Sequence, residues 1–135
     1  MSGFLDTSMV VRYLTGDVSE LAQRASAVID REEELWVTGE VIAEAAYMLT
    51  TVYQLPRELV VKHLSAFLRK RNLTPYALDK GLVLQGLLLC RGQVSFTDAM
   101  VWAAAKTSGA DVAYSLEERF PDDGIEVRRP QPSRP

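Results

Sequence analysis

The stretch FLDTS, residues 4–8, sets the pattern from which the fold can be worked out: two apolar residues give way at once to an acid and two hydroxyl residues. Phe4 and Leu5 are typical of a short strand, and Asp6 stands where that strand ends. An acid at the end of a buried element costs free energy unless something cationic meets it. Asp6 is therefore the first candidate site residue.

Three further acids are placed in a comparable way. Glu44 interrupts the apolar helix pattern VIAEAAYML, Asp98 lies just inside a helix start in SFTDAMVWAAA, and Glu117 follows a strand pattern in VAYSLEERF. At close range, four carboxylates repel one another unless they are protonated or bridged by a divalent cation. If the four converge, the sequence predicts a site for a hard cation.

Strand and helix patterns alternate through the chain. Strand patterns cover residues 4–5, 35–37, 112–115 and 125–127. Helix patterns end near residue 16, begin again after residue 19, and then cover residues 40–52, 56–70, 80–91 and 98–108. This alternation predicts an α/β fold with a parallel sheet covered by helices, and any site at the carboxyl ends of the strands.

Length and composition limit the class of protein. The chain has 135 residues, 47% hydrophobic and 24% charged, which suits one globular domain. We expect that domain over residues 1–127 and a disordered, proline-rich tail over residues 128–135. A net charge of −3 argues against broad, non-specific binding of polyanions but permits a transient nucleic-acid substrate.

The sequence also bears on compartment and metal type. It contains no apolar run long enough to cross a membrane and no secretory signal pattern. Cys90 and His63 are the single residues of their types, so neither a disulfide within the chain nor a zinc site built on them is expected. We expect a reduced, cytoplasmic protein without a membrane partner.

Each acid also has a purely structural interpretation. Asp6 could cap a helix, and Asp98 could be a first-turn acid favoured by the helix dipole. Glu117 could belong to a surface loop, and Glu44 could lie on a solvated helix face. Taken singly, the structural interpretation is favoured for three of the four. Taken together, their positions favour a shared site.

Taken in order, FLDTS, AEAAYML, FTDAMVWAAA and a strand followed by SLE resemble the PIN domain. Within that family, they are most similar to the ribonuclease toxins of VapBC-type toxin–antitoxin modules. The resemblance covers roughly residues 3–127. Asp6, Glu44 and Asp98 match the first three acids of the family. The fourth position usually reads Thr-x-Asp, whereas this chain has Ser-Leu-Glu ending at Glu117.

The resemblance implies a three-layer α/β/α sandwich with a mainly parallel central sheet. It also implies an acidic pocket that binds Mg²⁺ or Mn²⁺ and hydrolyses RNA phosphodiester bonds by a metal-activated water. Asp6 and Asp98 are the expected metal ligands. Glu44 is expected to ligate the metal or hold its water, and Glu117 to complete the catalytic set. Hard oxygen ligands of this kind are what these cations prefer.

The same resemblance implies partners. A VapB-like antitoxin would neutralise the nuclease, placing an Arg or Lys in the acidic site and an amphipathic segment in a groove near helices 40–52 and 56–70. A homodimer is expected as well.

Two other functions are open on the sequence. One is a catalytically impaired, metal-free binding module on the same scaffold. Glu117, which departs from the usual Asp of the family, is one change in that direction. The other is a metal-dependent phosphatase with Asp6 as nucleophile, although that chemistry needs a second Asp where this chain has Ser8.

Overall fold

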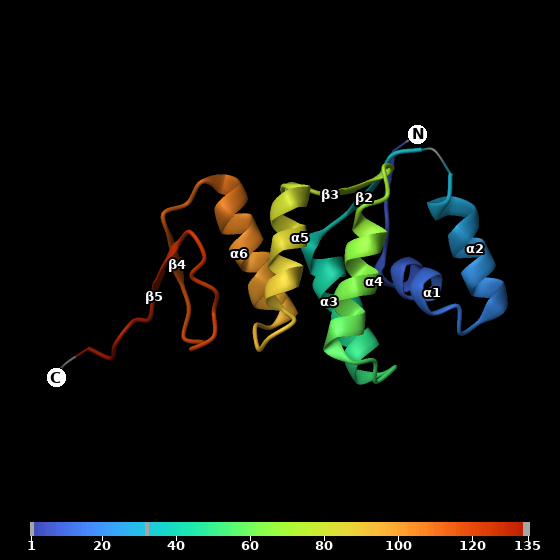
Figure 1. The fold of residues 1–135 in the computed structure, drawn as a ribbon. Coiled ribbons are helices and arrows are strands. Elements are labelled where there is room, and N and C mark those ends of the chain that lie inside the picture. Colours follow the sequence, from blue (N-terminus) through green and yellow to red (C-terminus); the bar gives the residue numbers. More distant parts are fainter. Residues whose placement is uncertain (1, 32, 134–135) are drawn as a thin grey trace.

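The computed structural model describes residues 2–31 and 33–133, and residues 1, 32, 134 and 135 lie outside the described part. Strands and helices alternate along the described chain, as expected (Figure 1). In chain order the elements are β1 (Gly3–Phe4), α1 (Thr7–Thr15), α2 (Ser19–Ile29), β2 (Leu35–Val37), α3 (Gly39–Thr51), α4 (Arg57–Leu68), β3 (Leu73–Pro75), α5 (Lys80–Leu89), α6 (Phe96–Ser108), β4 (Val112–Tyr114) and β5 (Glu126–Arg128).

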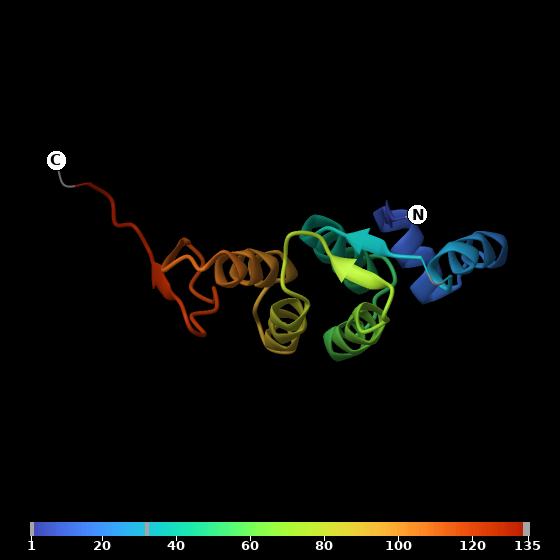
Figure 2. The same ribbon diagram turned by 90° about the horizontal axis from the view of Figure 1, so that it is seen from above.

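All described strand pairs are parallel, and they form two sheets. One sheet has the order β1-β2-β3 and the other pairs β4 with β5. The two views show these sheets well apart, with α6 beside the smaller one (Figures 1 and 2). The α/β class and the parallel pairing are confirmed. Among the described residues the parallel strands are divided between two sheets, because β4 pairs with β5 and not with β1.

The helix boundaries follow local chemistry. The side chains of Thr38, Asp79 and Ser95 each accept a hydrogen bond from a backbone N–H of the first turn, which starts α3, α5 and α6. Gly16 and Gly109 adopt left-handed φ angles of 62° and 75°, at which α1 and α6 end. Because Ser95 is the cap, α6 begins two residues before Asp98.

The three-stranded sheet has one buried and one open face. Leu35, Val37 and Leu73 are buried, and β2 and β3 run along the top of α3 and α4 in Figure 1. On the other face Phe4 contacts the rings of Trp36 and Tyr76, with centroids 5.2 and 5.1 Å apart. Phe4 and Tyr76 are 55% and 50% exposed, so this aromatic face is largely uncovered.

The strand β3 was not predicted from the sequence. It has only three residues and ends in Pro75, which lacks the N–H that a central strand needs. Leu73 and Pro75 are buried and Thr74 is exposed, so the period-2 signal is present but very short.

The interior is apolar, as the leucine-rich and alanine-rich helix patterns predicted. Trp102 is fully buried and donates a hydrogen bond from its Nε1 to the carbonyl of Asp123 at 2.9 Å. Cys90 is fully buried too, and burial raises the pKa of its thiol to about 12. No helix in the described ranges is long and apolar enough to cross a membrane.

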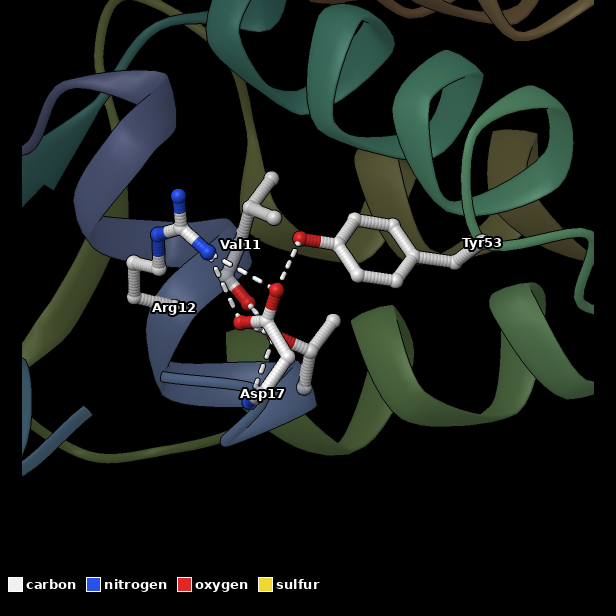
Figure 3. Close-up of polar contacts among 5 residues, drawn as sticks. Val11, Arg12, Asp17 and Tyr53 are labelled. Carbon is white, nitrogen blue, oxygen red and sulfur yellow. Dashed lines mark hydrogen bonds and ion pairs between the residues drawn. The ribbon is translucent and has the colours of Figure 1, made fainter. Parts of the chain in front are cut away.

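The ends of α1 and α3 are tied together at Asp17, a contact that sequence reasoning missed (Figure 3). The carboxylate of Asp17 accepts hydrogen bonds from Tyr53 at 2.7 Å, from Arg12 at 2.8 Å and from Thr15 at 2.8 Å. These hydrogen bonds, that of Tyr53 foremost, lower the pKa of Asp17 well below its ordinary value. The cluster fixes α1 against α3. Asp6 is the N-cap residue of α1, and Glu44 lies within α3.

The C-terminal segment begins inside a strand. β5 ends at Arg128, so the boundary predicted at residue 127 falls within it. The guanidinium of Arg129 donates hydrogen bonds to the carbonyls of Glu117 and Glu118 at 3.2 and 2.8 Å. The start of the predicted tail therefore holds the loop that carries one candidate acid. Residues 134 and 135 of that tail lie outside the described residues.

Candidate active site

Asp6 occupies the N-cap position of α1, but its side chain makes no capping hydrogen bond. Its Oδ2 instead accepts a hydrogen bond from Ser8 Oγ at 3.1 Å, and the carboxylate is exposed. The structural interpretation of Asp6 as a helix cap therefore has no support in its contacts. The geometry leaves its carboxylate oriented by Ser8 and open to a ligand.

Glu44 is connected to the same place through Thr7. The buried Thr7 donates a hydrogen bond from Oγ1 to Glu44 Oε2 at 3.1 Å, which joins α1 to α3. Thr7 was not singled out in the sequence, although it stands between Asp6 and Ser8. Asp6 and Glu44 are together called the first pair. Asp6 precedes Thr7 at the carboxyl end of β1, and Glu44 is joined to the same Thr7 by the hydrogen bond.

Asp98 and Glu117, the second pair, line one hollow of about 520 Å³. Asp98 is half-buried in the first turn of α6, where its N–H is bound by Ser95 Oγ at 3.0 Å. The N–H of Glu117 is bound by Ser115 Oγ at 3.0 Å, directly after β4. The second pair therefore lies at the carboxyl end of β4, as the first lies at that of β1.

The four acids do not converge within one chain. In the described ranges no group of three or more Asp, Glu, His or Cys side chains is placed to hold one metal ion. The physical reason is the divided sheet. β1 and β4 belong to separate sheets, so their carboxyl ends, and the acids that follow them, stay apart. The expected convergence is found as two separate pairs.

Arg119 is a further candidate that sequence reasoning missed. It lines the hollow of the second pair, where it brings a positive charge beside three acids, Asp98, Glu117 and Glu118. A guanidinium at such a position is suited to a phosphate oxygen. The only signal in the sequence was its place two residues after Glu117. Arg12, by contrast, is held by Asp17, and Lys106 donates to the carbonyl of Gly124.

An apolar groove of about 690 Å³ lies between α3 and α6. Tyr47 and Val101 are 64% and 48% exposed on its two sides, and Glu40 and Glu44 add carboxylates to its lining. Thr97, the residue before Asp98, lines it as well. The groove near the candidate site is thus built by α3 with α6, whereas the sequence suggested α3 with α4.

The donor set is suited to a hard divalent cation. Both pairs offer carboxylate oxygens, and hydroxyl oxygens of Ser8 and Ser95 lie beside them. Mg²⁺ and Mn²⁺ prefer such ligands over nitrogen and sulfur. Each pair alone, however, supplies only two carboxylates.

Comparison with known proteins agrees with the resemblance read from the sequence. The PIN domain family model matches residues 3–123, and the chain belongs to this family. PIN domains are generally nucleases that use divalent metals. The crystal structure of VapC20 of Mycobacterium tuberculosis, a sarcin-ricin loop cleaving toxin, is similar at 21% sequence identity and a TM-score of 0.42, covering 95% of this chain and 99% of that chain. No curated protein matches the chain.

Proposed function

We propose that this protein is a Mg²⁺- or Mn²⁺-dependent ribonuclease that cleaves internal RNA phosphodiester bonds, in the manner of VapC-like toxins. The observation that carries the proposal is the PIN family match over residues 3–123, within which one acid of each pair, Asp6 or Glu117, follows a parallel strand. Acids in those positions are exposed or half-buried and open to ligands. The proposed location is the cytoplasm.

The proposed roles follow from the contacts of each acid. Asp6, held by Ser8 in the first pair, and Asp98, held at the start of α6 in the second pair, would each contribute a carboxylate to metal binding. The ion, when bound, neutralises phosphate charge and lowers the pKa of water. Glu44 has one oxygen engaged by Thr7, which leaves the other to orient the attacking water or take its proton. Glu117 completes the carboxylate set.

The α3–α6 groove is the proposed docking place for a cognate antitoxin. Its apolar lining, with Tyr47 and Val101 exposed, is suited to an amphipathic segment. Glu40 and Glu44 would meet an Arg or Lys of that segment, which would compete with the metal and with the substrate phosphate. This partner would be a VapB-like protein, as the resemblance to VapBC-type toxins implies.

Cleavage of RNA by three variants tests the proposed function. Asp6→Asn and Asp98→Asn are expected to lower turnover at least 100-fold with Mg²⁺ or Mn²⁺ while the far-UV spectrum stays unchanged. Asp111→Asn is the matched control, because Asp111 is exposed and precedes β4, at the end opposite Glu117. Wild-type turnover in either site variant would refute the assignment.

A metal-free binding module is the second candidate, and the separation of the two acid pairs within one chain favours it. Such a module would bind RNA equally well in EDTA and in Mg²⁺ and would never cleave it. A nuclease would yield new RNA ends only when the metal is present. Gel analysis of labelled RNA with and without EDTA separates the two functions.

A further inference from the structure

The outer edge of β1 pairs with no other strand among residues 2–31 and 33–133. β1 is the end strand of its sheet. The N–H groups of Gly3 and Leu5 both donate toward β2, to Glu34 and Trp36. Because backbone polar groups of successive strand residues point to opposite edges, those of Phe4 face away from β2. The side chain of Phe4 is 55% exposed beside this edge.

The outer edge of β4 likewise pairs with no second strand in the part of the chain that the structure describes. Ser115 donates its N–H to Arg128, and the carbonyl of Asp111 accepts from Glu126, so these groups face β5. The backbone groups of Val112 and Tyr114 therefore point to the opposite edge. Tyr114 is 68% exposed there. An apolar strand edge of this kind is a template for pairing with another strand.

Within one chain, β4 is held away from β1. Three residues, 109–111, connect α6 to β4, and Trp102 and Lys106 of α6 hydrogen-bond to the carbonyls of Asp123 and Gly124. These contacts tie the strand pair to α6. α6 in turn packs on α3 and α5, and a Cβ at Gly86 of α5 would lie 3.1 Å from the carbonyl of Ala99. Closing the chain on itself would unpack these contacts.

We propose that a second copy of this chain supplies β4 to the free edge of β1, and receives β4 of the first copy in return. The pairing joins two incomplete sheets into one parallel sheet of order β3-β2-β1-β4-β5, with β4 and β5 from the second copy. The exchange is reciprocal, so it closes as a symmetric dimer. It covers both free edges and places Phe4 and Tyr114 on neighbouring strands.

Each active site is then shared between two chains. Asp6 follows the carboxyl end of β1, and Glu117 follows that of β4. Neighbouring parallel strands bring these ends to one edge of the sheet. Asp98 comes with Glu117, because both line one hollow, and Glu44 comes with Asp6 through Thr7. The second pair of one copy thereby meets the first pair of the other. This step rests on the proposed function, whereas the strand pairing does not.

Cross-linking tests the pairing without any measurement of activity. Phe4→Cys and Tyr114→Cys chains, with different tags, are co-expressed and treated with a short bis-maleimide. We expect a covalent species of twice the 15.0 kDa chain mass that carries both tags. Cys90 is fully buried and does not interfere. Val52→Cys, exposed at the far end of α3, replaces Phe4→Cys in the control and should give no such species.

A doubly substituted chain, Phe4→Cys with Tyr114→Cys, separates the alternatives further. Linkage within a single chain of 15.0 kDa, with none between the singly substituted chains, would show self-closure and overturn the proposal. Absence of both linkages at micromolar concentration would overturn it as well.

Complementation tests the shared site. Asp6→Asn keeps the second pair and Asp98→Asn keeps the first pair. In a mixed dimer one of the two sites combines Asp6 of one chain with Asp98 of the other and is intact. An equal mixture of two inactive variants should therefore recover about a quarter of wild-type cleavage, since half of the dimers are mixed. Sites contained in single chains would recover none.

The two experiments separate the inference from the function on which it rests. Tagged heterodimers together with an inactive wild type would uphold the pairing and refute the nuclease. An active wild type without complementation would uphold the nuclease and refute the shared site.

Discussion

The hydroxyl of Thr7 donates a 3.1 Å hydrogen bond to Oε2 of Glu44, which joins the first turn of α1 to α3. Thr7 is buried, whereas Glu44 is exposed. The contact therefore fixes an acid that would otherwise be free to rotate on a helix surface. Asp6 is the residue before Thr7, so the same contact sets the relation between the two acids of the first pair.

Thr7→Val keeps the shape of this side chain and removes its hydroxyl. Loss of one hydrogen bond is expected to cost about 1 kcal/mol of unfolding free energy. RNA turnover should fall roughly 10-fold, because Glu44 loses its fixed orientation. Thr7→Ser keeps the hydroxyl and should retain most activity. Denaturant unfolding and steady-state cleavage measure the two effects, and equal turnover in both variants would mean that the contact is only structural.

Divalent metal should stabilise the folded protein. A ligand that binds only the folded state at a concentration 100-fold above its Kd adds about 2.7 kcal/mol. Mg²⁺ or Mn²⁺ at such a concentration should raise Tm by several degrees. Asp6→Asn and Asp98→Asn should lose the rise, while Asp111→Asn should keep it. Thermal melting with and without EDTA measures this effect. A wild-type Tm that does not change with either ion would count against a metal site.

Glu117 stands where the family usually has Asp. Glu117→Gln keeps the size of the side chain and removes its charge, so turnover should fall about 10-fold or more with little change in melting temperature. Glu117→Asp should retain or improve activity, because it restores the usual side chain. Equal turnover in the wild type and both variants would make Glu117 a surface residue and reduce the site to three acids.

The Asp17 cluster should give the protein an acid-dependent stability. Its hydrogen bonds lower the pKa of Asp17 in the folded state below the unfolded value. The stabilisation is therefore fully present above the unfolded pKa, near pH 4, and is lost as the pH falls further toward the folded pKa. Asp17→Asn should unfold at lower denaturant concentration than the wild type at pH 7, and the difference should shrink below pH 4. A difference independent of pH would show that charge is not involved.

Most of the fold was predictable because its signals are local. β2 was predicted at its observed bounds, and caps such as Asp79 and terminators such as Gly16 and Gly109 lie close to the helix ends they predicted. β3 was missed because three residues ending in Pro75 carry almost no periodicity. Local signals of this kind say which elements form, and they leave open how distant elements pair.

The candidate site shows the same limit. The sequence identified four acids expected to converge. In the structure Asp6 follows β1 and Glu117 follows β4, while Glu44 is joined to α1 through Thr7 and Asp98 shares a hollow with Glu117. The sequence did not identify that β4 pairs with β5, and with no other strand in the described ranges, because strand pairing depends on long-range contacts such as the hydrogen bond from Trp102 to Asp123. It also missed Thr7 and Arg119, whose importance depends on neighbours far away in the chain or on the shape of a hollow.

The free edges of β1 and β4 affect how cleavage activity depends on the concentration of the chain. If two chains must meet before one catalytic centre exists, then at dilution below the dimer dissociation constant the number of centres grows with the square of the chain concentration. Halving the amount of protein would then remove about three quarters of the cleavage, by mass action. With the proposed toxin function, a cell that makes a few copies would contain few catalytic centres, whereas a modest rise in synthesis would raise their number disproportionately.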